Sequence, residues 1–311
     1  MSKVRFGILL PDFPEDDSRG REHTQNIITY LETLDNVYES VWLGDHFTEG
    51  MLTTMDADIL ECLTALSYLS AKFPNLYFGP LTLASSFRNP AYLAKITSTL
   101  SVLSDGKFIL GMGAGWNEEE YRQYGYEFPS NKVRIKQMEE AIQIIRLLWT
   151  QDDVTFTGKY HRVENAYCNP KPDPLPPILI GGGGEKFTLK ATAKYADWWN
   201  GFCYDIETWT HKLNVLANHC DDVGRDYDDI VKSLGLHVAL AGSDEEALRL
   251  AKRSWLRLER CTIGSPETVT AKLNDLVDAG VEYFQLAFTP FPNYEATQTF
   301  ADKVIPELTY Q

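Results

Sequence analysis

The feature that most constrains the fold is a regular alternation of short apolar runs with segments of helical spacing. The apolar runs lack the strict apolar-polar alternation of strands with one face in water. Parallel strands covered on both faces have this pattern. Eight runs are predicted as strands: Val4–Leu10, Ser40–Gly44, Leu76–Ala84, Lys107–Met112, Ile178–Gly181, Trp198–Phe202, Ser233–Ala241 and Tyr283–Phe288.

Helices are predicted where apolar residues recur at positions i, i+3, i+4 and i+7. Pro90 suits a first helical position, and Ser243 with Glu246 three residues later forms a capping-box pattern. Gly280 is typical of a residue just after a helix. The predicted helices are 26–34, 59–69, 90–103, 118–124, 131–149, 185–195, 207–223, 243–256, 265–279 and 294–308.

This element order predicts a parallel sheet, either closed into a barrel or open and doubly wound. Eight strand-helix units favour a single (β/α)8 TIM barrel over residues 1–311. Residues 151–177 form an irregular connector with Gly158 and five prolines. Pro80 lies inside the third strand and predicts a distortion there, because proline donates no ladder hydrogen bond.

Charge and composition exclude several partners. The chain has 29 basic and 44 acidic residues, a net charge of −15, which argues against nucleic acids and anionic membranes. No apolar stretch is long enough for a membrane span, and the amino terminus lacks a signal-peptide pattern, so we expect a cytoplasmic protein. Five cysteines without a CxxC pair predict free, mostly buried thiols, and the scattered histidines predict no metal site.

The carboxyl ends of the strands should carry the chemistry, as they do in barrels of this type. Asp45-His46 follows the second strand and is the best catalytic candidate, because histidine titrates near neutral pH and a carboxylate can tune it. The alternative is a histidine that only forms a hydrogen bond at a strand end. Asp12 and Phe13 follow the first strand, and Phe87 and Trp116 follow the third and fourth; these four are expected to line a substrate pocket.

Two glycine clusters stand between a strand and a helix. The first cluster predicts a binding site for an anion at a helix amino terminus; it consists of Gly181, Gly182, Gly183 and Gly184. The positive charge of Lys186 would favour an anion there, and the negative charge of Glu185 would oppose it. A flexible turn without a ligand is the alternative. The cluster Gly111-Met-Gly113-Ala114-Gly115 is not a dinucleotide fingerprint, because Trp116 occupies the wrong position. We interpret it as space for a flat ring, and Trp42, Trp198 and Trp199 as core residues.

Several stretches resemble the luciferase-like flavin-dependent oxidoreductases over most of the chain. They are VWLGDHF, FGPLTLASSFRNPA, LSDGKFILGMGAGWNEEEY, RLLWTQDDVTFTGKY, PPILIGGGGEKFTLKATAKYADWWN and GSPETVTAKLNDLVDAGVEYFQL. The resemblance implies a luciferase-like TIM barrel that binds FMN or the deazaflavin coenzyme F420. The Asp-His-Phe sequence is most similar to the F420-dependent branch of the family.

That branch implies roles for individual residues. His46 would act near the ring carbon that carries the hydride, and Asp45 would lie against the ring. A cis peptide behind the ring would fall at Leu81-Thr82, Gly113, Ala114 and Gly115 would lie at the cofactor, and the glycine run would hold its phosphate. Members are often dimers, so a homodimer is possible.

One departure bears on the substrate. Sugar-phosphate dehydrogenases of this branch place a catalytic glutamate where this chain has Trp116. We therefore expect a flatter, apolar small molecule as substrate, and hydride transfer between F420 and an alcohol, carbonyl, imine or activated alkene. The alternatives are an FMN-dependent monooxygenase that uses O2 and a non-catalytic flavin-binding protein.

Overall fold

A computed structural model describes residues 4–15, 18–48, 56–202, 205–254 and 258–308. The chain forms two compact units, each built from several parts of the sequence. The first contains residues 1–60, 200–214 and 231–311, and the second contains residues 61–199 and 215–230. Two elements include residues of both units: β9 (Trp198–Gly201) and α7 (Ile206–Val223).

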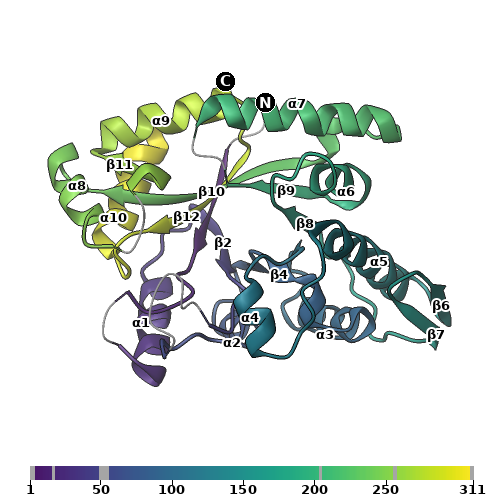
Figure 1. Ribbon diagram of the computed structural model, residues 1–311. Helices are drawn as coiled ribbons and strands as arrows, with labels where there is room; N and C mark the ends of the chain where they lie inside the picture. The colour runs from purple at the N-terminus through teal and green to yellow at the C-terminus, as the bar shows by residue number, and fades with distance from the viewer. Residues whose placement is uncertain (1–3, 16–17, 49–55, 203–204, 255–257, 309–311) are drawn as a thin grey trace. The chain divides into compact units, whose positions relative to one another are not determined.

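The first unit is built on five parallel strands. Their order is β2 (Tyr38–Leu43), β1 (Arg5–Leu9), β12 (Tyr283–Phe288) and β10 (Val231–Leu240), and β11 (Cys261–Gly264) pairs with the far edge of β10. The helices are α1 (Gly20–Glu32), α8 (Asp244–Ala251), α9 (Pro266–Asp278) and α10 (Tyr294–Thr299) (Figure 1). Three aromatic rings pack together in the core of this unit. Phe6 of β1 stacks on Phe284 of β12 and meets Phe300 edge-on.

The second unit has the parallel order β4 (Leu83–Ala84), β5 (Leu110–Gly113) and β8 (Ile178–Gly181), with β3 (Tyr77–Pro80) preceding β4. Its helices are α2 (Cys62–Lys72), α3 (Pro90–Leu103), α4 (Glu118–Gln123), α5 (Asn131–Thr150) and α6 (Thr188–Tyr195). A separate antiparallel hairpin, β6 (Val154–Thr157) and β7 (Arg162–Ala166), stands next to one end of α5 (Figure 1).

Most predicted elements are confirmed, three of them at both ends. The strands Ile178–Gly181 and Tyr283–Phe288 and the helix Pro90–Leu103 have the predicted bounds. Asn89 caps that helix by accepting hydrogen bonds from the N–H groups of Ala91 and Tyr92 at 2.9 and 3.2 Å. Side chains at a helix amino terminus satisfy N–H groups that have no partner inside the helix.

The expected distortion in the third strand is confirmed. The strand stops at Pro80 and resumes at Leu83, and the intervening Leu81-Thr82 peptide bond is cis, as the family resemblance implied. The buried tryptophans Trp42, Trp198 and Trp199 are core residues, as predicted. None of the four described cysteines forms a disulfide bond, and Cys62, Cys168 and Cys220 are buried; Cys203 lies outside the described residues.

Several predicted bounds were wrong, and one strand was missed. Helix α1 starts at Gly20 and not at residue 26, because its first two turns are polar and give no apolar periodicity. Helix α8 ends at Ala251, five residues before the predicted end. The short strand β11 was missed because four residues carry too little pattern to be distinguished from a loop.

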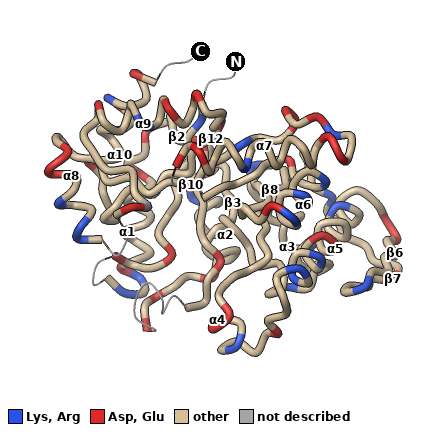
Figure 2. Tube along the Cα trace, turned by 45° about the horizontal axis from the view of Figure 1, so that its top comes forward, with Lys and Arg blue, Asp and Glu red and all other residues tan. Residues whose placement is uncertain are grey.

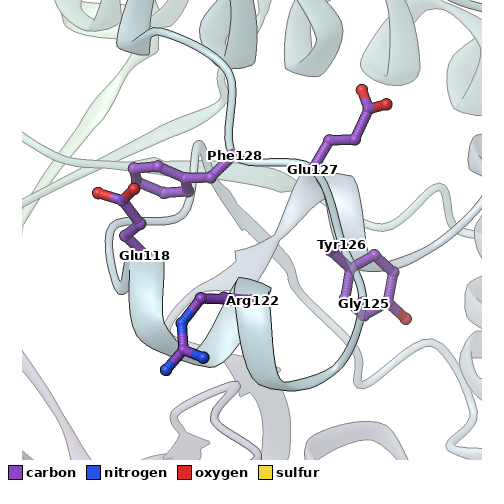
Figure 3. A pocket seen from close by; sticks show the side chains of 6 residues that line it. All are labelled: Glu118, Arg122, Gly125, Tyr126, Glu127 and Phe128. Carbon is purple, nitrogen blue, oxygen red and sulfur yellow. The ribbon is translucent and has the colours of Figure 1, made fainter.

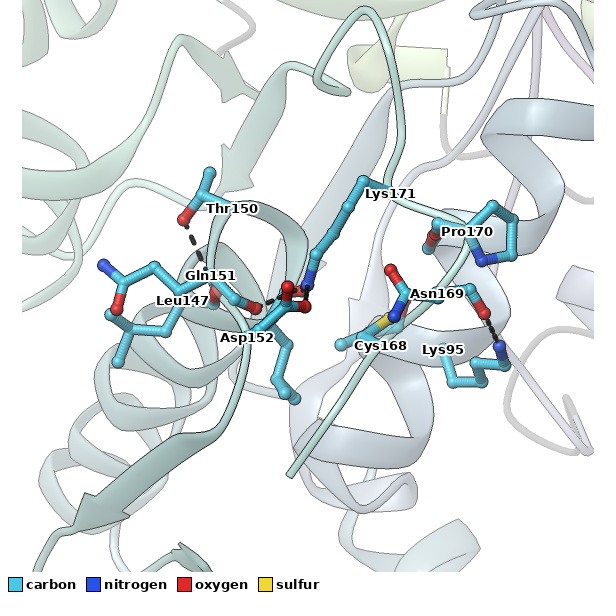
Figure 4. A network of polar contacts seen from close by, with 12 residues as sticks. Lys95, Leu147, Thr150, Gln151, Asp152, Cys168, Asn169, Pro170 and Lys171 are labelled. Atoms are coloured by element: carbon cyan, nitrogen blue, oxygen red, sulfur yellow. Dashed lines mark hydrogen bonds and ion pairs between the residues drawn. The ribbon is translucent and has the colours of Figure 1, made fainter. Parts of the chain in front are cut away.

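The connector 151–177 is also more ordered than its proline content indicated. Beyond the hairpin, its return segment is tied to α3 and α5 (Figure 4). The Lys171 ammonium donates to the Leu148 carbonyl at 2.9 Å and to the Gln151 carbonyl, and pairs with Asp152 at 3.1 Å. A cation at these last carbonyls stabilises the carboxyl end of α5.

The hairpin turn is anchored by one carboxylate of α5. Glu140 accepts hydrogen bonds from the N–H groups of Lys159, Tyr160 and His161 at 2.8, 2.8 and 2.9 Å. Burial raises the pKa of Glu140, but these hydrogen bonds lower it more, so the net pKa is below its usual value. The ionised form therefore stabilises the folded hairpin.

We predict that Glu140→Gln lowers the free energy of unfolding by about 1–3 kcal/mol at pH 7, the usual range for losing hydrogen bonds to a charged group. Because the folded-state pKa is depressed, this stabilisation is present above the unfolded-state pKa of about 4.3 and is lost as the pH falls through the folded value. Urea unfolding at several pH values measures it.

Glu164→Gln is the matched control, because its pair with Arg162 on the same hairpin is exposed. An equal loss of stability in both variants, or a Glu140→Gln effect that does not shrink toward acid pH, would contradict the anchor.

Candidate functional site

The predicted catalytic residues belong to the first unit, where the loops after β1 and β2 meet. Leu9 pairs with Trp42, so the two strands end at the same level. A methyl group on Gly44 would stand 2.0 Å from Asp12 Oδ1, so the Asp12 carboxylate lies directly on this glycine. Asp45 and Phe13 are buried, and His46 is half-buried. The parallel register thus brings Asp12 to the Gly44-Asp45-His46 segment.

A second polar cluster in this unit was not predicted. His237 of β10 is in register with Cys261 of β11, so both side chains stand on the same face of the sheet. Glu15 accepts hydrogen bonds from Thr289 Oγ1 at 3.1 Å and from Ser254 Oγ at 3.4 Å.

The histidine and the thiol of this cluster are both uncharged at neutral pH. Burial lowers the pKa of His237 to about 4. Burial, followed by the charges of Glu15 and Glu259, raises the pKa of Cys261 to about 11. Sequence reasoning missed the cluster because β11 was not recognised. Within the described ranges, no group of three or more His, Cys, Asp and Glu side chains is arranged to hold a metal ion.

The second unit brings together Leu81, Thr82 and the two glycine clusters. The side chain of Thr82, which follows the cis peptide bond, lies across β5 and β8. A methyl group on Gly113 would stand 2.5 Å from Thr82 Oγ1, and one on Gly181 would stand 2.8 Å from Thr82 Cγ2. On Gly111 it would stand 2.0 Å from the Pro80 carbonyl oxygen. These glycines make room for the distorted third strand.

This packing gives the Gly111–Gly115 cluster a structural reason for its glycines. The space on the side-chain side of Gly111 and Gly113 is filled by Pro80 and Thr82, and at Gly115 the Tyr121 hydroxyl would stand 1.9 Å from a methyl group. The protein itself therefore fills the side on which a Cβ of these glycines would point. The assignment of Gly113, Ala114 and Gly115 to a cofactor site remains a prediction.

Arg134 holds the loop that follows β5, and the sequence analysis did not identify it. Its side chain is 7% exposed, donates from Nε to the Ala114 carbonyl at 3.2 Å, and stacks on the Phe128 ring at 3.8 Å. Tyr121 Oη approaches the same carbonyl at 3.4 Å. Sequence position alone gives no signal for this role, because Arg134 lies on α5, remote from the loop in the chain.

The two aromatic candidates of this unit have different environments. Phe87 is buried and packs on Tyr121 and Tyr126, with ring centroids 4.6 and 4.9 Å away. Trp116 is 53% exposed. A hollow of about 410 Å³ lies beside α4, lined by Glu118, Arg122, Gly125, Tyr126, Glu127 and Phe128 (Figure 3). Neither Phe87 nor Trp116 lines it.

The glycine run after β8 has a backbone suited to an anion. Gly182 has φ +116°, a conformation that favours glycine, and the segment leads into α6. The N–H groups of Gly183 and Lys186 donate no hydrogen bond to any residue that the structure describes. An anion would satisfy them, as anions do at other helix amino termini.

Two ammonium groups lie close to this run. Lys186 Nζ is 5.5 Å and Lys132 Nζ is 5.9 Å from the ring centroid of Phe187. Basic and acidic residues are interspersed along α5, whereas the charged residues of α6 are the lysines Lys190 and Lys194 (Figure 2). These lysines supply local positive charge in a chain of net charge −15.

We predict that Gly113→Ala lowers the free energy of unfolding by about 1–3 kcal/mol, as overpacking does, because the added methyl group collides with Thr82 Oγ1. Thr82→Ala in the same chain should relieve most of that loss, since the next atom is then 3.6 Å away. Chemical unfolding of the single and double variants measures the coupling. Additive losses would contradict the proposed contact.

Comparison with known proteins gives the family. A sequence model described as luciferase-like monooxygenase matches residues 4–260. A relative named F420-dependent glucose-6-phosphate dehydrogenase from Amycolatopsis mediterranei is 27% identical over 271 residues, which are 85% of this chain and 76% of that protein.

Solved structures agree with the chain over nearly its whole length. An F420-dependent secondary alcohol dehydrogenase bound to an F420-acetone adduct matches with a TM-score of 0.84 and 19% identity, over 99% of this chain and 100% of that one. The oxygenating part of 3,6-diketocamphane monooxygenase from Pseudomonas putida, in complex with FMN, matches with a TM-score of 0.82 and 17% identity, over 100% of both chains. At such identities the likeness establishes the fold.

The predicted fold class and the resemblance are therefore confirmed. None of the described helices is long and apolar enough to cross a membrane. The alternating parallel strands and helices and the match over residues 4–260 lead to one conclusion. This chain belongs to the luciferase-like monooxygenase family and has its (β/α)8 barrel fold.

Proposed function

We propose that this chain is an F420-dependent oxidoreductase that transfers hydride between the deazaflavin and a small organic substrate. The observation that carries the proposal is the Asp45-His46 pair at the carboxyl end of β2. The similarity to relatives named F420-dependent glucose-6-phosphate dehydrogenases supports the choice of cofactor.

The residues present fit an anionic cofactor. Gly181, Gly182, Gly183 and Gly184 would hold its phosphate, because the unused N–H groups of Gly183 and Lys186 and the nearby ammonium groups favour an anion there. The family resemblance implies that Leu81, Thr82, Gly113, Ala114 and Gly115 would contact the ring and that Asp45 would lie against it.

His46 would move the proton that accompanies hydride transfer. When bound, F420 supplies a ring carbon that accepts or donates a hydride. In alcohol oxidation the substrate loses a hydride from carbon and a proton from its hydroxyl oxygen, and His46 takes that proton. In the reverse direction His46 returns it to the carbonyl oxygen. The buried Asp45 carboxylate would hold the charged imidazole in place.

The substrate would be small and partly apolar. Asp12, Phe13, Phe87 and Trp116 are the proposed lining residues. Glucose 6-phosphate is not proposed, although relatives carry that name. Trp116 occupies the position at which the family resemblance implies a catalytic glutamate in the sugar-phosphate dehydrogenases. Alcohols, carbonyls, imines and activated alkenes all fit hydride transfer.

We predict that the purified protein binds F420 with micromolar or lower Kd and FMN at least about tenfold more weakly, a difference of about 1.4 kcal/mol. Quenching of tryptophan fluorescence during titration measures both affinities. Preference for FMN would overturn the cofactor choice and favour an oxygen-using monooxygenase, which the structural likeness to an FMN-bound protein makes the second candidate.

We predict that His46→Ala lowers kcat by about 10²–10⁴, the usual contribution of a general acid or base, while F420 affinity stays within about threefold. The exposed His211→Ala is the matched control and should leave kcat unchanged. A His46→Ala enzyme of normal kcat would remove this histidine from the chemistry. F420 binding with no turnover across the substrate classes named above would favour the non-catalytic alternative.

A further inference from the structure

The glycine loop, defined as residues Gly181–Lys186, is held by two side chains that come from other elements. Trp199 of β9 donates from Nε1 to the Gly182 carbonyl at 2.9 Å. His219 of α7 lies with Nε2 2.8 Å from the Glu185 carbonyl oxygen. Because a carbonyl oxygen only accepts hydrogen bonds, Nε2 of His219 carries the hydrogen.

These two bonds set the direction of the peptide groups. In a trans peptide the carbonyl of one residue and the N–H of the next point in opposite directions. Trp199 and His219 draw the carbonyls of Gly182 and Glu185 toward themselves. The N–H groups of Gly183 and Lys186 therefore point away from these anchors. Neither has an acceptor within the described residues, and the same holds for the N–H groups of Gly184 and Phe187.

His219 is suited to hold this geometry. Its side chain is 18% exposed, and its Nδ1 lies 3.8 Å from the Asp222 carboxylate one turn along α7. Nδ1 is buried and accepts no hydrogen bond from the described residues. The bond to Glu185 is thus the hydrogen bond that links this imidazole to the loop.

We propose that His219 is a positioning residue for the phosphate site: through the Glu185 carbonyl it aims the Lys186 N–H at the anion. The inference rests on the proposed function, since the anion is the phosphate of the flavin-type cofactor. His219 itself does not contact the phosphate in this proposal.

The test compares His219→Leu, which removes the donor, with His219→Gln, whose Nε2 can donate from a similar place. Each is titrated with F420 and with the same deazaflavin lacking the phosphate and the groups beyond it, by fluorescence quenching. His219→Leu should bind F420 about tenfold more weakly and His219→Gln within about threefold of wild type, and the phosphate-free ligand should bind all three alike.

A control keeps folding separate from binding. His211→Leu removes an exposed histidine from the same helix and should change neither affinity. Thermal unfolding of each variant is measured alongside, and the phosphate-free ligand reports an intact ring site even if His219→Leu is less stable.

Other outcomes would overturn the proposal in distinguishable ways. Equal weakening of both ligands by His219→Leu, or failure of His219→Gln to restore F420 affinity, would reduce the residue to a general structural role. If wild type prefers F420 over the phosphate-free ligand and His219→Leu keeps that preference, only the role of His219 fails. If wild type binds both ligands equally, the phosphate site fails and the role of His219 with it. If wild type binds neither ligand, the proposed function fails as well.

Discussion

Parallel main-chain pairing between strands from distant parts of the sequence is the constraint on which each unit depends. In the first unit, β1 is in register with β2 on one side and β12 on the other. The register is reinforced by buried polar contacts: Asn200 Nδ2 donates to Gln285 Oε1 at 3.0 Å and approaches Ser233 Oγ at 3.3 Å. If one strand slipped by one residue, its side chains would exchange the two faces of the sheet. These polar groups would then lose their hydrogen bonds in the core, which would lower the stability of the fold.

In the second unit the same pairing is maintained around a break. The Thr82 side chain lies across the neighbouring strands, and a Cβ at Gly113 or Gly181 would collide with it. Gly113 and Gly181 are therefore fixed by a side chain on another strand. The two glycine clusters, which in the sequence look like independent ligand motifs, share one packing requirement.

Main-chain carbonyls in the loops at the strand ends are fixed by donors from elsewhere. Arg134 of α5 holds Ala114, Trp199 of β9 holds Gly182, and His219 of α7 lies on Glu185. Each bond satisfies an acceptor and also orients the N–H of the following peptide. Loops supported in this way present a defined set of donors, which is what a rigid binding site requires.

The sequence by itself determined the order of strands and helices, because apolar periodicity is a local property. Its capping residues fixed the start of α3 at Asn89 and the end of α9 at Gly280. It also placed Asp45-His46 and the glycine run at strand ends, since the carboxyl end of a strand follows from its direction.

Only the tertiary structure decided what those loops contact. The roles of Arg134 and His219 could not be predicted from the sequence. Arg134 binds a carbonyl 20 residues away in the chain, and His219 binds one 34 residues away. The sequence also did not predict the contact of Thr82 with Gly181 or the strand pairing that places His237 beside Cys261. Periodicity records which face of an element is buried, and it carries no information on which distant side chain meets it.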